Sequence, residues 1–227
     1  MYLYIKITIM AKKKNISDQN ILSFYMDYVL EHGAPPKSVY MFAKTNNFEE
    51  SKFYEYFGTF EAVEKRIFRV LFEDTLKLLN KSDDYQLFDA RNKLLSFYFT
   101  FFENLTANRS YVLFALQQHK NALKNLSVLT ELKTGFTNYI ASLDIETLDL
   151  KEERIDKIQG RALQESAWIQ LLLTMKFWMD DTSTSFEKTD VFIEKSVNTS
   201  FDILNITPLK SVIDLGKFLF KEKMQMK

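Results

Sequence analysis

The stretch FEESKFYEYFGTFEAV, residues 48–63, decides the fold of this chain. Three aromatic residues within four positions lie directly before a turn at Gly58. Thr59 can begin the next helix, because its hydroxyl accepts a hydrogen bond from a free backbone N–H of the first turn. The stretch therefore predicts a short helix over 49–56, a turn, and a long helix that runs to about residue 80.

Two further helices are expected upstream of this stretch. Apolar residues recur at three- and four-residue spacing between Ile21 and Val29, which is typical of one face of a helix over 17–32. Gly33 supplies the left-handed residue that ends many helices. A second helix is expected over 37–45. Three short helices with a tight turn before the third form the helix-turn-helix plan.

The remainder of the chain predicts only helices. The expected ranges are 85–105, 109–124, 126–143, 153–179, a helix that opens at residue 184, and 208–223. Thr184 and Glu187 fit a capping box at the start of one of them. With only 5 Gly and 3 Pro, the chain has little room for the many turns of a β fold, so we expect an all-α protein.

The composition excludes several classes of protein. A chain without cysteine has no disulfide, thiolate metal site or cysteine nucleophile, and its two histidines lie far apart in sequence. No run approaches the ~18 apolar residues of a membrane span. No nucleophile-and-base constellation or glycine-rich phosphate loop is present. We therefore expect a cytoplasmic protein that is not an enzyme and uses no metal or cofactor.

The first 14 residues are expected to form an extension and a basic arm. Residues 1–9 are apolar, but the basic run Lys12–Lys14 follows them, whereas a signal peptide has its basic residues first. We expect Met10 to be the natural start.

The stretch 48–63 resembles the DNA-binding domain of the TetR family of one-component transcriptional regulators. The residues that match the family pattern are Tyr54, Tyr56, Phe57, Glu61 and Val63. The resemblance covers about residues 15–75. It implies a TetR-like fold with a helix-turn-helix DNA-binding domain over 15–60, followed by a larger helical ligand-binding and dimerisation domain over 61–227.

The resemblance also implies which residues contact an operator in double-stranded DNA. They are Lys37, Ser38, Lys44, Lys52, Tyr54 and Tyr56. The tyrosines and Ser38 would bind phosphates, the serine at a helix N-terminus where backbone N–H groups attract anions. The lysines would contact phosphates or bases, and Lys12–Lys14 would follow the backbone or minor groove.

Charge in the same segment opposes DNA binding. The expected recognition helix carries Glu49, Glu50 and Glu55, and Phe60 stands where the family has lysine. Residues 11–60 hold six lysines (12, 13, 14, 37, 44, 52) and six acids (18, 27, 31, 49, 50, 55). The segment therefore lacks the basic excess that supplies affinity for phosphates. The alternative is an inherited scaffold whose tyrosines only pack.

The larger domain carries 15 of the 21 Phe and 4 of the 11 Tyr. We expect a small hydrophobic ligand to be bound by Tyr98, Phe101, Phe102, Phe114, Phe136 and Trp168. The alternative is a packed core, which is the commoner role of such residues. The two helices around 160–205 would pair with those of a second copy and make a homodimer.

Residues 177–193 are similar to the C-terminal part of the lipid-binding protein of coenzyme Q biosynthesis, which shares the TetR-like fold. Two hypotheses follow. The first is a homodimeric repressor that a small apolar ligand releases from DNA. The second is a lipid- or isoprenoid-binding protein on a TetR-like scaffold that no longer reads DNA.

Overall fold

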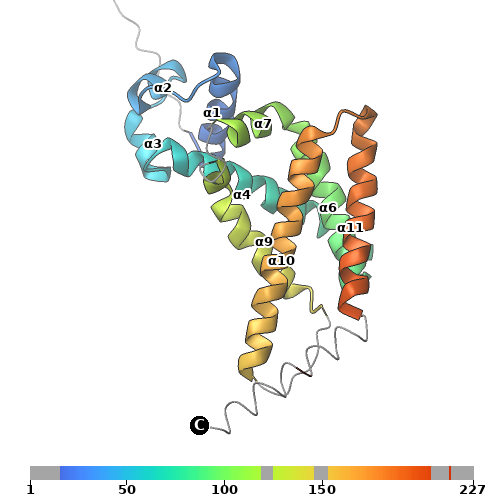
Figure 1. Ribbon diagram of the computed structural model, residues 1–227. Coiled ribbons are helices and arrows are strands. Elements are labelled where there is room, and N and C mark those ends of the chain that lie inside the picture. The colour runs from blue at the N-terminus through green and yellow to red at the C-terminus, as the bar shows by residue number, and fades with distance from the viewer. Residues whose placement is uncertain (1–15, 119–124, 146–152, 206–214, 216–227) are drawn as a thin grey trace, which may run out of the picture. The chain divides into compact units, whose positions relative to one another are not determined.

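The computed structural model describes residues 16–118, 125–145, 153–205 and 215 (Figure 1). Within these ranges the chain forms helices and turns and no strand, so the all-α prediction is confirmed. The helices are α1 (Asp18–His32), α2 (Val39–Thr45), α3 (Glu50–Tyr56), α4 (Phe60–Leu79), α5 (Asp83–Leu87), α6 (Ala90–Ala107), α7 (Arg109–Gln117), α9 (Thr130–Ser142), α10 (Glu153–Asp180) and α11 (Glu187–Asn205), with 3₁₀ turns η1 (Ser127–Leu129) and η2 (Thr184–Phe186). The expected helix over 208–223 lies almost wholly outside the described residues.

The chain divides into two compact units. The first contains the chain up to Phe68 together with residues 110–128. The second contains residues 69–109 and the chain from Leu129 onward. Helices α4 and α7 therefore each contribute residues to both units, and the first unit extends beyond the 15–60 range expected for the helix-turn-helix domain.

Local sequence sets the ends of α1 in the first unit. The Ser17 side chain accepts a hydrogen bond from the backbone N–H of Asn20, and the Asn20 side chain accepts one from the backbone of Ser17, which is a capping box. Gly33 ends the helix with φ +63°, and its N–H donates to the carbonyl of Val29. The expected Gly33 stop is confirmed, and the residue that caps the helix is Ser17.

The first unit is built around the ring of Phe42, which is fully buried. Rings from α1, from the α2–α3 turn, from α3 and from α4 surround it. Phe60 is one of them, with ring centroids 5.5 Å from Phe42, 5.5 Å from Tyr25 and 5.1 Å from Phe53. The residue that stands where the family has lysine is therefore half-buried and packs against this core.

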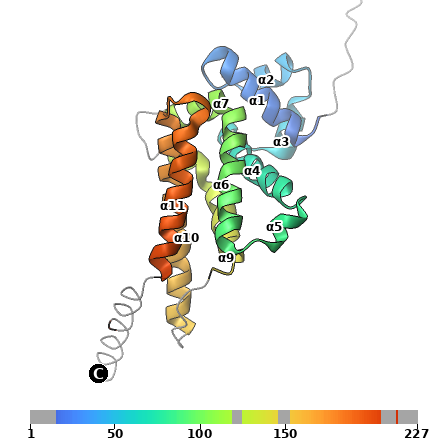
Figure 2. The same ribbon diagram turned by 90° about the vertical axis from the view of Figure 1, so that its right-hand side faces the viewer.

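In the second unit, α6, α9, α10 and α11 enclose an aromatic core. Helix α10 packs on α9 and α11, and α11 also packs on α6, as Figures 1 and 2 both show. The sequence predicted a single helix over 85–105, but the structure has α5 and α6 with a break at Asp89. The reason is local, because Asp89 takes an extended conformation and its carboxylate accepts a hydrogen bond from the N–H of Asn92 at 2.8 Å.

The connection between α10 and α11 is held by Asp181, which is buried. Its carboxylate accepts hydrogen bonds from the N–H and hydroxyl groups of Ser183 and Thr189, over 2.7–2.9 Å. Burial raises the pKa of the Asp181 carboxyl, but these four donors outweigh it and lower the pKa to about 2. The carboxylate therefore stays charged and fixes the turn.

The capping box expected at Thr184 and Glu187 is not formed. Ser185 and Phe186 both have positive φ, 53° and 60°, so the chain enters α11 only at residue 187. Asp181 and Ser183 supply the cap instead, because Ser183 also accepts a hydrogen bond from the N–H of Lys188.

Candidate functional site

The six residues expected to contact DNA all lie in the first unit, on α2, on α3 or just before α2. Tyr54 is 55% exposed on α3, whose only buried residue is Phe53. Lys37 and Lys44 are exposed, and within the described residues neither forms an ion pair. Ser38 caps α2, since its hydroxyl accepts a hydrogen bond from the N–H of Met41 at 3.2 Å.

Besides Ser38, two more of the six are engaged within the protein, Lys52 and Tyr56. The ammonium of Lys52 lies 2.8 Å from the carboxylate of Glu55 on the next turn of α3. This hydrogen bond raises the pKa of Lys52 and offsets its charge. The hydroxyl of Tyr56 donates to the backbone carbonyl of Ile16 at 3.3 Å. Both groups would have to exchange these partners before they could bind a phosphate.

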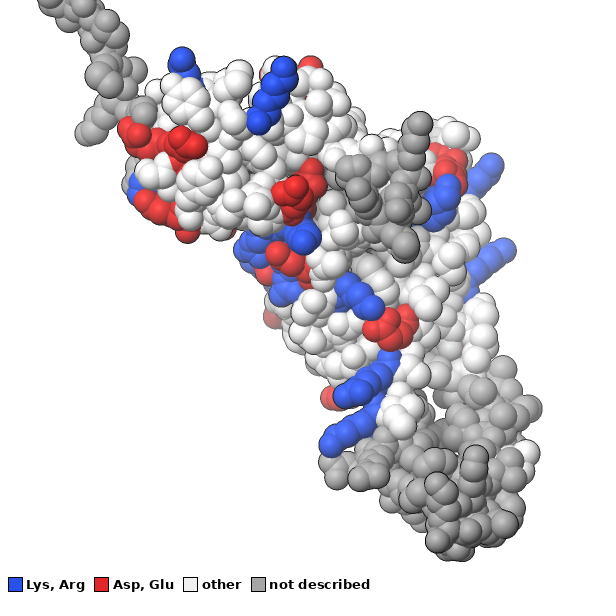
Figure 3. All heavy atoms as spheres, turned by 60° about the vertical axis from the view of Figure 1, so that its left-hand side comes forward, with Lys and Arg blue, Asp and Glu red and all other residues white. Residues whose placement is uncertain are grey.

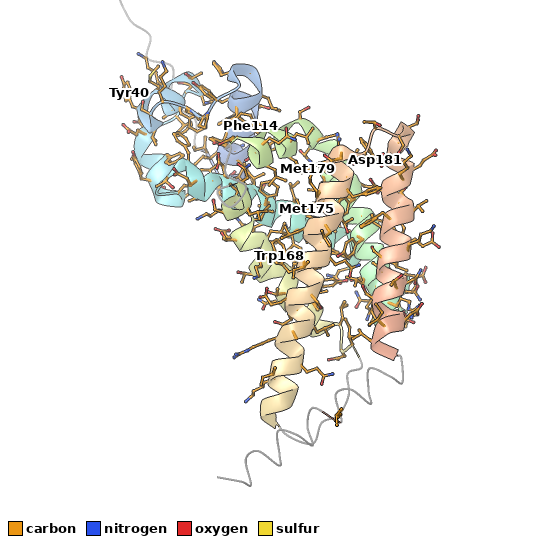
Figure 4. All side chains as sticks on the ribbon, in the orientation of Figure 1. Tyr40, Phe114, Trp168, Met175, Met179 and Asp181 are labelled. Atoms are coloured by element: carbon orange, nitrogen blue, oxygen red, sulfur yellow. The ribbon has the colours of Figure 1, made fainter. Side chains whose placement is uncertain are left out.

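The structure adds two exposed residues on α2 that the sequence analysis did not single out. Tyr40 is 59% exposed and Met41 55% exposed, and Figure 4 shows Tyr40 at the outer side of α2. The ammonium of Lys44 lies 6.0 Å from the Tyr40 ring centroid. In Figure 3 an acidic patch lies beside the grey N-terminal residues, and basic side chains lie at separate places with uncharged surface between them. The helical periodicity of α2 could have identified Tyr40 and Met41 as exposed, because only Phe42 and Ala43 of this helix are buried.

A buried carboxylate in the first unit also escaped sequence reasoning. Glu64 on α4 is 7% exposed and accepts hydrogen bonds from the hydroxyl of Tyr25 at 2.5 Å and from the side-chain amide of Gln118 at 3.2 Å. Burial and then the bond to Glu64 raise the pKa of Tyr25. These residues come from three distant parts of the sequence, so no spacing rule could have joined them.

The six residues expected to bind a ligand are mostly packed against one another or against other rings. Phe114 belongs to the first unit, on α7 (Figure 4), and the other five belong to the second. Trp168 and Phe136 have ring centroids 6.4 Å apart, and Tyr98 and Phe102 are stacked at 6.1 Å. The expectation that the six form one ligand site stays a prediction.

Tyr98 has an unpaired hydroxyl in this aromatic core. The side chain is fully buried, its oxygen has no hydrogen-bond partner among the described residues, and burial raises its pKa. Tyr139 offers a matched case, because its hydroxyl pairs with that of Tyr85 at 3.0 Å and donates to the carbonyl of Lys93 at 3.1 Å.

We therefore expect Tyr98→Phe to keep or raise the free energy of unfolding, by up to about 1–2 kcal/mol, because it removes an unsatisfied buried oxygen. Tyr139→Phe should lower it by about 1 kcal/mol, because it leaves hydrogen-bonding partners unpaired. Urea denaturation of both variants measures the difference. A clear loss of stability in Tyr98→Phe would contradict an unpaired hydroxyl.

A cavity of about 970 Å³ lies elsewhere in the second unit. It follows α10 and α11, and Leu94 of α6, Ile140 of α9 and Ile145 contribute to its wall. None of the six expected ligand residues lines it. Its volume lies at the upper end of the range for small-molecule sites.

The face that α10 and α11 share is apolar and exposed. Side chains that are 36–65% exposed follow it along both helices: Ile158, Ile169, Leu173, Phe177, Val191 and Ile203. Five of them also line the cavity, the exception being Ile158. Large exposed apolar patches on soluble proteins usually mark an interaction site.

A sequence model of the family described as tetracyclin repressor-like, C-terminal domain, matches residues 93–219. The chain belongs to this TetR-like family. The match confirms the resemblance seen in the N-terminal stretch, from the opposite end of the chain. Membership points to a regulator rather than an enzyme. Comparison with curated proteins gives no match.

The matched TetR-like domain includes a cation held between aromatic rings. The guanidinium carbon of Arg109 lies 4.4 Å from the Trp178 ring centroid and 4.5 Å from that of Phe186. The same guanidinium donates to the carbonyls of Trp178 and Met179, at 3.1 Å each. Arg109 thus neutralises the C-terminal end of α10 and supports Phe186 in its left-handed conformation.

The described residues of the TetR-like chain provide neither a membrane-spanning helix nor a metal-ligand cluster. No described helix has the length and apolar character needed to cross a membrane. The same residues hold no group of three or more side chains suited to a metal ion.

Proposed function

We propose that the protein is a homodimeric TetR-like transcriptional repressor that binds an operator through α2 and α3 and is released by a small apolar ligand. The observation that carries the proposal is the exposure of α3 in a chain of this family. Only Phe53 of α3 is buried, so the helix has one buried anchor, and the side chains on its exposed face, Tyr54 among them, can enter a major groove.

The exposed apolar face of α10 and α11 supports dimerisation. Two such helix pairs, one from each copy, can bury these side chains in a four-helix seam. Phe177 and Phe192 already stack across the pair at 4.7 Å, so each copy would present a preformed surface.

Fluorescence anisotropy with the promoter DNA of the protein's own operon, at several salt concentrations, tests the proposal. We expect specific binding whose affinity falls as salt rises, because phosphate contacts release counterions. Absence of specific binding at low salt would overturn it.

The ion pair on α3 gives a sharper prediction. Glu55→Gln removes a carboxylate and frees the ammonium of Lys52, which lies 2.8 Å away. We expect DNA affinity to rise about fivefold at low salt, with a steeper salt dependence by roughly one phosphate contact. Glu31→Gln removes the same charge from an exposed position on α1 and serves as control. An equal gain in both variants would show that Lys52 makes no contact of its own.

A lipid- or isoprenoid-binding protein is the second candidate. Two observations favour it. At the expected DNA face Lys52, Tyr56 and Phe60 contact other residues of the protein, and the second unit contains the apolar cavity. Native mass spectrometry of the purified protein would detect a co-purified lipid. An empty dimer that binds its operator would exclude this candidate.

A further inference from the structure

We propose that the cavity along α10 and α11 binds a long-chain carboxylate, with its head at Lys195 and its chain directed toward Leu94 and Ile140. The proposal deepens the function proposed above by naming the chemical class of its ligand.

The shape of the cavity favours an elongated ligand. Its lining follows α11 from Glu187 to Leu204, which corresponds to about 26 Å of helix. A compact ligand would leave most of that length empty, whereas a single extended chain fills it.

The chemistry of the lining changes along this length. The lining includes the apolar residues Leu94, Ile140, Ile145, Leu163 and Leu204, of which Leu94 and Ile140 are buried. Hydroxyl and amide groups collect in the middle, where Ser200 donates to Gln170 at 2.9 Å and Gln170 donates to Ser196 at 3.4 Å. About 14 Å of helix separates Lys195 from Leu204, which gives room for a chain beyond the polar zone.

Charge along the lining favours an anion. The charged residues among the described lining are Glu187, Lys188 and Lys195, and they carry a net positive charge. Lys195 is exposed and forms no ion pair within the described part of the chain. Two exposed hydroxyl residues of the same lining, Ser166 and Thr199, can add hydrogen bonds to a carboxylate.

The mouth of the cavity coincides with the proposed seam between two copies. Ile169, Leu173 and Val191 line the cavity and are also about half exposed. In the dimer the partner would cover this opening and exclude water from the bound chain. Closure of the mouth rests on the proposed dimer. Binding of a long-chain carboxylate in the cavity does not depend on the dimer.

Displacement of a dansylated undecanoic acid from the full chain, in the absence of DNA, tests the proposal. We expect sodium laurate to displace the probe. Lys195→Gln should raise the dissociation constant of laurate about five- to tenfold, as for loss of a partly exposed ion pair. Dodecanol should be affected less than twofold by the same change. Lys176→Gln, an exposed lysine of α10 outside the lining, is the matched control.

A second variant tests the position of the chain. Ala167→Phe places a ring in the cavity wall and should weaken laurate and dodecanol alike by more than tenfold, with thermal unfolding as the check on folding. Any of three results would overturn the proposal. Laurate could fail to displace the probe, Lys195→Gln and Lys176→Gln could weaken laurate equally, or dodecyltrimethylammonium could bind as tightly as laurate. Laurate binding without operator binding would support the carboxylate site and contradict the proposed repressor. Operator binding without laurate binding would support the repressor and contradict the carboxylate site.

Discussion

Leu173→Glu is expected to convert the proposed dimer to a monomer. Leu173 is 58% exposed in the single chain, near the middle of the apolar face on α10. In the proposed seam its replacement would bury an unpaired carboxylate, which costs about 3–5 kcal/mol. At about 1.4 kcal/mol for each factor of ten, the dimer dissociation constant should rise at least a hundredfold.

Sedimentation velocity over a concentration series measures this change. Glu194→Lys is the control, because Glu194 is exposed on α11 and lies outside the cavity lining. Leu173→Glu should leave the monomer folded, since exposed side chains away from special features tolerate substitution. A dimer that survives Leu173→Glu unchanged would place the seam elsewhere.

Arg109→Ala is expected to destabilise the fold more than removal of a surface charge would. The change removes two charge-assisted hydrogen bonds to the end of α10 and two cation–π contacts. Together these should lower the free energy of unfolding by about 2–4 kcal/mol. For a chain of this size, the melting temperature should fall by about 5–15 °C, which differential scanning calorimetry measures.

Arg91→Ala is the matched control. Arg91 also lies over an aromatic ring, that of Phe201, and pairs with Asp202 at 2.7 Å, but Asp202 is 64% exposed. An exposed pair of this kind contributes about 1 kcal/mol or less. Arg109→Lys should restore less than half of the loss, because an ammonium lacks the planar fork that reaches both carbonyls. Equal losses for Arg91→Ala and Arg109→Ala would contradict a special role for Arg109.

Sequence reasoning succeeded where the signal is local. The Gly33 stop and the Thr59 cap each depend on residues within four positions, and the hydroxyl of Thr59 accepts a hydrogen bond from the N–H of Ala62. The same local rule gave a wrong capping box at Thr184. There the carboxylate of Asp181 accepts hydrogen bonds from the N–H and hydroxyl of Thr189, eight residues further along the chain. When several donors are available to a carboxylate, the folded structure determines which of them it accepts from.

The candidate site was predicted less fully than the fold. The exposure of Tyr54 on α3 agrees with the helix-turn-helix pattern. The Lys52–Glu55 ion pair could have been read from its i,i+3 spacing. The large cavity could not, because its wall joins residues of α6, α9, α10 and α11 that share no sequence period. Aromatic residues fill space as readily as they line it, and composition alone does not separate the two roles.

The packing of Phe60 limits what a substitution at this position can achieve. Its ring packs against three others in the first unit, so a lysine introduced there would lose these ring contacts even though its ammonium could reach water. The residue type that the family carries at this position would therefore add a positive charge to the expected DNA face and lower the stability of the first unit together. Basic substitutions at exposed positions of the same face, with Phe60 retained, would add charge without that loss.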